Sequence, residues 1–142
     1  MIGVLIATHG KMAEGILDSA ELIIGKQDNC KVLSLCHGDS IELFGESIRN
    51  AIIELSQGDG VLVFTDLFSA SPYNQVALNY PHLKNYKYRS VTGVNLPMLI
   101  EALSKRILGE DLDAITESIM EVGKEGIKEL FSELKKVKNN FI

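Results

Sequence analysis

The stretch that decides the fold is MIGVLIATHGKMAEGIL, residues 1–17. Its apolar run, residues 2–7, stops at Thr8-His9-Gly10, and the pattern of an amphipathic helix begins almost at once. The apolar positions of this pattern are Met12, Ile16, Ala20, Ile23 and Ile24. A short apolar run that leads directly into a helix is typical of a buried parallel strand. His9 is therefore expected in the first strand-to-helix turn, at the sheet edge where open α/β folds bind ligands.

The rest of the chain repeats this alternation of strand and helix. Further strands are predicted at residues 32–35, 61–64 and 86–91, and helices near 41–55, 71–80, 96–107 and, in one or two segments, 111–138. Asp39 with Glu42 predicts a capping box for the second helix, and Ser71-Pro72 predicts Ser71 as the N-cap of the third. The order predicts an α/β fold. It is a single three-layer domain, residues 1–142, whose mostly parallel, doubly wound sheet has four strands in the order 2-1-3-4 and helices on both faces.

The composition argues against several classes of function. The 142 residues carry a net charge of −5, which argues against nucleic acid as a partner because phosphate binding needs a basic surface. No apolar run approaches the roughly 20 residues of a membrane span. The N-terminus lacks the pattern of a signal peptide, so a cytoplasmic protein is expected. Cys30 and Cys36 flank a predicted strand that would hold them about 20 Å apart, so reduced thiols are expected.

Polar side chains follow the predicted strands at the same sheet edge. The first and third strands are neighbours in the order 2-1-3-4, so His9 and Asp66 are expected to face each other. A carboxylate that accepts one ring N–H fixes the tautomer of the imidazole and leaves the other nitrogen as a nucleophile. Ser71 stands at a helix N-terminus, which favours an anion. We predict a site that takes up and releases a phosphoryl group, with His9 and Asp66 catalytic, Gly10, Ser69 and Ser71 phosphate-binding, and no metal or cofactor.

Each of these residues also has a purely structural interpretation. A histidine in a loop is most often a polar surface residue, Asp66 could serve only to cap a turn, and Ser71 could serve only to begin a helix. His37 could approach the same sheet edge, but it is interpreted as a loop residue. His82, at a helix end, is interpreted as a surface residue.

Several short motifs follow one another in an order and spacing that is specific when they are taken together. They are Ala7-Thr8-His9-Gly10, Ala13-Glu14-Gly15, Asp66, Ser71-Pro72, Gly93-Val94-Asn95-Leu96-Pro97-Met98-Leu99 and Gly123-Lys124-Glu125-Gly126. Through them, nearly the whole chain resembles the IIA component of the mannose-type family of the bacterial phosphoenolpyruvate-dependent sugar phosphotransferase system.

The resemblance implies that His9 accepts a phosphoryl group from the phosphocarrier HPr and passes it to a histidine of a IIB component, which serves the membrane components IIC and IID. It implies that Asp66 orients His9, that Ser71 belongs to a phosphate-binding turn, and that no metal or nucleotide takes part. It also implies four parallel strands plus an antiparallel edge strand, and a homodimer in which an edge element is exchanged.

The chain departs from the family pattern in two places. The family loop usually carries two glycines before Ser-Pro, whereas Ser69 and Ala70 stand here, which removes backbone freedom. The family often continues into a fused IIB domain, whereas the sequence stops at Ile142, so a separate IIB protein is expected.

Two other functions stay open from the sequence. The related subunit that donates to dihydroxyacetone kinase would use the same His9 with another partner. A non-enzymatic, flavodoxin-like binding module would hold an anion or a partner without being phosphorylated. A P-loop and a dinucleotide-binding site are disfavoured, because G-x-x-x-x-G-K-[ST] and G-x-G-x-x-G are both absent.

Overall fold

The computed structural model of the chain describes residues 1–140, so residues 141 and 142 of the predicted domain lie outside the described residues. The elements follow in the order β1 (Gly3–His9), α1 (Met12–Ile24), β2 (Cys30–Leu35), α2 (Ile41–Leu55), β3 (Val61–Thr65), α3 (Ser71–Leu78), a short 3-10 helix η1 (Tyr80–His82), β4 (Tyr88–Val91), α4 (Leu96–Ile107), α5 (Leu112–Glu125) and α6 (Leu130–Asn140). The predicted alternation of strands and helices is confirmed, and residues 111–138 hold two helices.

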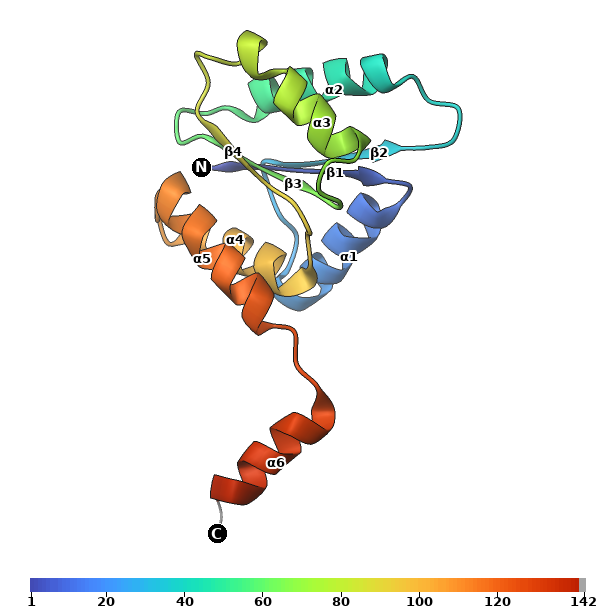
Figure 1. Cartoon of the computed structure of the whole chain (residues 1–142). Helices are drawn as coiled ribbons and strands as arrows, with labels where there is room; N and C mark the ends of the chain where they lie inside the picture. The colour runs from blue at the N-terminus through green and yellow to red at the C-terminus, as the bar shows by residue number, and fades with distance from the viewer. Residues whose placement is uncertain (141–142) are drawn as a thin grey trace.

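The four strands form one parallel sheet in the order β2-β1-β3-β4, which confirms the predicted topology. In this arrangement β1 lies between β2 and β3, and β4 is an edge strand (Figure 1). The register pairs Ala7 with Thr65 and His9 with Leu35. The carboxyl ends of β1, β2 and β3 therefore meet at one edge of the sheet.

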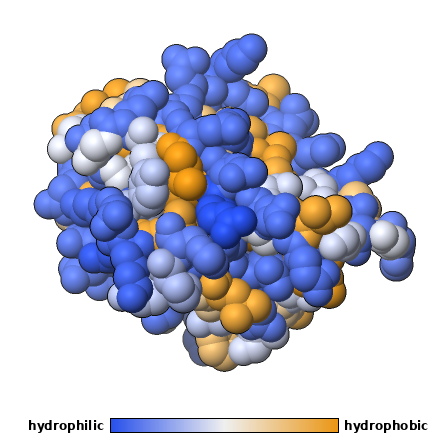
Figure 2. All heavy atoms as spheres, turned by 90° about the horizontal axis from the view of Figure 1, so that it is seen from above, coloured by the Kyte–Doolittle hydropathy of each residue, from blue (hydrophilic) through white to orange (hydrophobic). Residues whose placement is uncertain are grey.

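Helices cover both faces of the sheet. In Figure 1, α2 and α3 lie above it, and α1, α4 and α5 lie below it. Alternate residues of β1 supply the two cores: Leu5 packs with α2 and α3, whereas Val4 and Ile6 pack with α1, α4 and α5. All residues of β3 are buried, as expected for a strand covered on both faces. From the side of α2 and α3, the surface is mostly hydrophilic with separate apolar patches (Figure 2).

The predicted capping residues are each displaced by one position. Ser40, not Asp39, is the N-cap of α2, and its hydroxyl accepts from the backbone N–H of Leu43. The Asp39 carboxylate instead accepts from the backbone N–H of Cys36 and closes the loop before the helix. At α3 the N-cap is Ala70 in an extended conformation, because Ser71 is already helical. The Ser71 hydroxyl is therefore not used as a cap.

The C-terminal segment projects from the body of the chain (Figure 1). The N–H of Gly126 closes the last turn of α5, and α6 begins at Leu130. The antiparallel edge strand implied by the resemblance is not formed by residues 1–140, because residues 130–140 are helical. No helix within those residues has the length and apolar character that crossing a lipid bilayer requires. Both cysteines are free, and burial raises the pKa of the Cys30 thiol to about 11.

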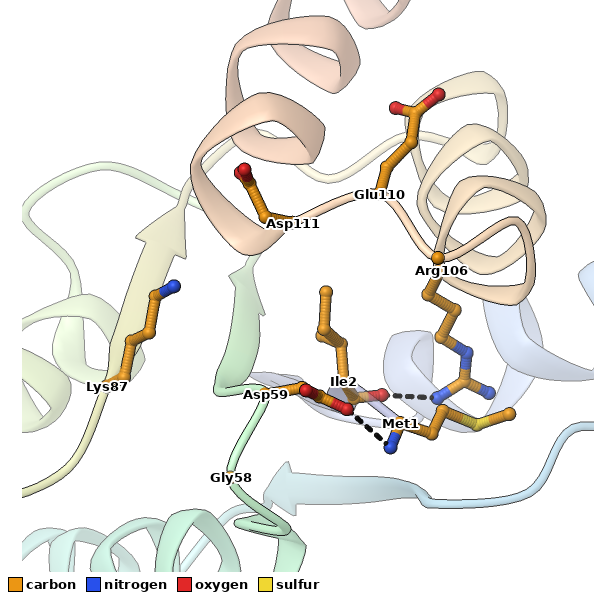
Figure 3. A pocket seen from close by; sticks show the side chains of 9 residues that line it. Met1, Ile2, Gly58, Asp59, Lys87, Arg106, Glu110 and Asp111 are labelled. Atoms are coloured by element: carbon orange, nitrogen blue, oxygen red, sulfur yellow. Dashed lines mark hydrogen bonds and ion pairs between the residues drawn. The ribbon is translucent and has the colours of Figure 1, made fainter.

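Arg106 ties the amino-terminal end of the sheet together. Its side chain is only 5% exposed, and Nη1 donates to the carbonyl oxygens of Ile2, at 2.9 Å, and Asn29, at 3.1 Å. Nη2 donates to the carbonyl oxygen of Asp28 and to Oε1 of Gln27. These bonds join the end of α4 to the starts of β1 and β2. Arg106 also lines a polar pocket of about 280 Å³ at this end of the sheet (Figure 3).

We predict that Arg106→Met lowers the free energy of unfolding by about 3 kcal/mol, because it removes the hydrogen bonds that a buried guanidinium donates to the carbonyl oxygens of Ile2, Asp28 and Asn29. The measurement is urea unfolding followed by circular dichroism. The matched control is Arg89→Met, on edge strand β4, which removes an exposed ion pair with Asp113 of α5. It should lower the free energy of unfolding by less than about 1 kcal/mol. Equal losses in the two variants would contradict the structural role of Arg106.

Candidate functional site

His9 and Asp66 meet at the carboxyl ends of β1 and β3. Oδ2 of Asp66 accepts two hydrogen bonds from His9, one from the backbone N–H at 2.9 Å and one from ring atom Nδ1 at 2.8 Å. The pair is asymmetric in exposure: the His9 side chain is 48% exposed and the Asp66 side chain 13%. A largely buried carboxylate therefore holds an imidazole that remains accessible to a reactant.

The electrostatics of the pair define the state of the imidazole. Burial of Asp66 opposes its ionisation, but the hydrogen bonds from the ring and the backbone of His9 outweigh it and hold the pKa of the carboxyl below its usual value. An ionised carboxylate can only accept hydrogen bonds, so Nδ1 of His9 carries the hydrogen that faces it. In the neutral ring, Nε2 then keeps its lone pair and is the nucleophilic atom.

The turn after β1 is shaped by Thr8 and Gly10. Thr8 is fully buried, and its hydroxyl accepts from the backbone N–H of Ala13 in the first turn of α1. Gly10 has φ +56°, in the left-handed region that favours glycine, and its N–H donates to the carbonyl oxygen of Leu35 at 2.8 Å. The amide of Gly10 is thus engaged by β2, and the residue acts on the site through the shape of the turn.

Ser69 and Ser71 lie in the loop that leads from Asp66 into α3. Ser69 has φ +64°, and Ser71 is the first residue of the helix. The backbone N–H groups of Ser71 and Tyr73 have no acceptor within residues 1–140, as expected for the first turn of a helix. Pro72 between them has no N–H. The predicted phosphate-binding turn therefore presents two unpaired donors at a helix N-terminus that faces the carboxyl edge of the sheet.

A hollow of about 450 Å³ opens beside His9 on the side of β2. It is lined by His9, Gly10, Lys11, Leu35, Cys36 and His37. His37, which the sequence pattern indicates as a loop residue, lies on the same hollow as His9. On the opposite side, Leu67 and Phe68 follow Asp66 and are 61% and 68% exposed. A reactant that approaches His9 would meet apolar side chains around a polar centre.

Two residues at this edge were not singled out from the sequence. Thr8 caps the turn below His9, and a threonine five residues before Ala13, in the first turn of α1, was the available signal. Asn74 donates from its side chain to the carbonyl oxygen of Ser69, at 3.0 Å, and stands one turn after the loop it contacts. Among residues 1–140, His, Cys, Asp and Glu side chains form no group of three arranged to hold a metal ion.

The chain is similar in sequence to known components of the phosphotransferase system. Residues 3–120 match the family described as "EIIA-man: PTS system fructose IIA component". The chain is 32% identical over 132 residues to the "PTS system mannose-specific EIIAB component" of Escherichia coli K12, covering 91% of this chain and 39% of that protein. It is 30% identical over 106 residues to the "PTS system fructose-specific EIIA component" of Bacillus subtilis, covering 75% of this chain and 71% of the relative.

Solved structures show the same likeness. The crystal structure of phosphotransferase system component EIIA from Streptococcus agalactiae has a TM-score of 0.85 at 29% identity, over 93% of this chain and 99% of the other. The PTS IIA protein associated with the fucose utilization operon of Streptococcus pneumoniae has a TM-score of 0.79 at 30% identity, over 93% and 95%. With most of its length matched by the family and its fold shared with these structures, the chain belongs to the EIIA-man family of phosphotransferase system IIA components.

Proposed function

We propose that the chain is a phosphoryl-transfer intermediate of the sugar phosphotransferase system. In this role, His9 accepts a phosphoryl group from phospho-HPr and passes it to a IIB component for sugar uptake, so that membrane components IIC and IID are served only indirectly. The observation that carries the proposal is the double hydrogen bond from His9 to Oδ2 of Asp66. Membership of the EIIA-man family supports it.

The proposed step uses the free nitrogen of His9. The lone pair of Nε2 attacks the phosphorus, the bond from phosphorus to the donor breaks, and its electron pair stays with the donor. The imidazole gains positive charge as the new N–P bond forms, while Nδ1 keeps its hydrogen. The ionised carboxylate of Asp66, 2.8 Å from Nδ1, stabilises that charge and holds the ring in one orientation. The reverse sequence delivers the group to the acceptor.

The phosphoryl oxygens need donors that do not compete with His9. The unpaired N–H groups of Ser71 and Tyr73, the hydroxyls of Ser69 and Ser71 and the dipole of α3 would supply them. In this proposal Gly10 contributes only the shape of its turn. The reaction is carried by side chains and backbone groups, with no metal or cofactor as a participant.

The names of the relatives bear on which protein accepts the phosphoryl group. The relatives are named as mannose-, fructose- and sorbose-specific components, which favours a IIB component over dihydroxyacetone kinase. The chain spans 39% of the length of the E. coli relative. We propose that residues 1–142 form one domain that carries out the IIA step in the cytoplasm. Incubation of the phosphorylated protein with each acceptor would distinguish the two.

We also propose that the chain acts as a homodimer. Helix α6 projects from the body and exposes apolar side chains at helical spacing: Leu130, Phe131, Leu134 and Val137 are each more than half exposed. Such a face needs a covering partner. The dimers that the family resemblance implies support a second copy of this chain as that partner.

Substituting His9 should abolish phosphorylation. Incubation with phosphoenolpyruvate, enzyme I and HPr is expected to label the wild type with an acid-labile, base-stable phosphate, and His9→Gln is expected to carry none. His82→Gln, which removes an exposed histidine of η1, is the matched control and should be labelled like the wild type. Labelling that persists in His9→Gln would refute the proposed role of His9.

Removing the Asp66 carboxylate should slow phosphoryl transfer without unfolding the protein. Asp66→Ala frees the imidazole to rotate and to exchange tautomers, so we expect the single-turnover rate to fall about a hundredfold. Asp18→Ala, on the exposed surface of α1, should transfer at the wild-type rate. Rapid-quench measurement of the labelled protein gives the rates, and circular dichroism verifies folding. A wild-type rate in Asp66→Ala would exclude Asp66 from the mechanism.

A charge on the apolar face of α6 should dissociate the proposed dimer. Wild type is expected to sediment with twice the 15.6 kDa mass of the chain, and Leu134→Glu with the mass of one copy. Lys135→Glu introduces the same carboxylate at an exposed polar position of α6 and should remain dimeric. Sedimentation of the wild type as a monomer at micromolar concentration would argue against the dimer.

A further inference from the structure

The loop between β3 and α3 contains a strained serine. Of residues 1–140, only Asn29 and Ser69 adopt positive φ without being glycine, at 47° and 64°. Asparagine enters the left-handed region more readily than most residues, whereas serine has no such preference. Ser69 therefore has a tendency to leave this conformation, and the surrounding structure must oppose it.

The side chain of Asn74 is the contact that opposes it. Its Nδ2 donates to the carbonyl oxygen of Ser69 at 3.0 Å, and its backbone N–H donates to the carbonyl oxygen of Ala70 at 2.9 Å. Asn74 thus holds two successive carbonyl groups of the loop from within α3. The bond from the N–H of Ala70 to the carbonyl oxygen of Leu67 is longer, at 3.3 Å, so the loop closes only weakly on itself.

The conformation of the loop of residues 67–71 determines which hydroxyl and N–H groups are directed toward His9. Ser69 lies between Asp66, which holds the imidazole, and Ser71, whose N–H is unpaired within the described chain. If Ser69 relaxed to negative φ, the hydroxyls and N–H groups on either side of it would turn away from their present directions. We propose that Asn74 is a positioning residue for phosphoryl transfer, which holds the loop of residues 67–71 in the conformation that receives the phosphoryl group. This inference rests on the function proposed above for His9.

The first test is Asn74→Ala in the full chain. Because alanine favours helix more than asparagine does, this change should not weaken α3 itself. We expect the single-turnover rate of phosphoryl transfer to fall about tenfold, the amount that corresponds to loss of one hydrogen bond. The KM for the phosphoryl donor should change less than the rate. Asn85→Ala, at an exposed asparagine outside the loop, is the matched control and should keep the wild-type rate.

The second test is rescue by glycine. Ser69→Gly removes the preference for negative φ, so the loop can keep its conformation without the side chain of Asn74. Each Asn74→Ala change is compared with its own parent, so that loss of the Ser69 hydroxyl cancels. Asn74→Ala should slow transfer about tenfold in the wild type but much less in Ser69→Gly. A full tenfold loss on adding Asn74→Ala to Ser69→Gly would show that Asn74 acts in another way, and would overturn the proposal. A wild-type rate in Asn74→Ala would overturn it as well.

A third measurement uses the unphosphorylated protein and separates this inference from the function it rests on. Loss of the Asn74 side chain should speed hydrogen exchange at the amide of Ala70 about tenfold, and Ser69→Gly should reverse the change. If exchange at Ala70 responds to Asn74→Ala as expected but the wild type takes up no phosphate, the proposed function fails, while the role of Asn74 in holding the Ser69 loop stands. If hydrogen exchange at the amide of Ala70 is the same in Asn74→Ala and wild type, Asn74 does not hold the loop and the inference is refuted.

Discussion

A single carboxylate oxygen, Oδ2 of Asp66, accepts hydrogen bonds from both the backbone N–H and the ring atom Nδ1 of His9. The arrangement depends on the parallel pairing of β1 with β3, whose register sets Ala7 beside Thr65 and so brings the two strand ends together. The hydrogen bond from the backbone N–H fixes the position of His9, and the hydrogen bond from Nδ1 fixes the orientation of its imidazole ring. One carboxylate therefore sets position, tautomer and orientation at once, which a single hydrogen bond to the ring could not do.

The two ends of the sheet carry different tasks. At the amino ends, buried Arg106 joins α4 to the starts of β1 and β2 through carbonyl oxygens. At the carboxyl ends, His9 is half exposed and the loop before α3 leaves donors unpaired. The bonds that Nη1 and Nη2 of Arg106 donate stabilise the fold at one end, whereas the unpaired donors of the other end are left for a reactant. This separation allows the loop of residues 67–71 to hold a strained serine without loosening the sheet.

Local pattern was sufficient for most of the fold and for the central pair of the site. Continuous apolar runs marked β1 and β3, and helical spacing marked the helices that cover them. His9 and Asp66 were found because both follow buried strands, and parallel strands end at the same edge. At α2 the cap is displaced to Ser40 because Asp39 and Ser40 are equally suitable by residue type. At α3 Ser71 is the better cap by residue type, but it is already helical, so Ala70 takes the N-cap position. Arg106 was missed because an arginine on an amphipathic helix is usually exposed.

The sequence by itself determined the order of strands and helices, the burial of β1 and β3, and the placing of His9 and Asp66 at strand ends, since these depend on periodicity and residue type. Only the tertiary structure decided that one oxygen of Asp66 accepts two bonds, that the N–H of Gly10 donates to Leu35, and that the Asn74 side chain donates to the carbonyl oxygen of Ser69. Each of these is a contact between groups whose distance is set by the packing of separate elements or by the path of a loop. Residue spacing along a chain contains no information on such distances until the elements have packed.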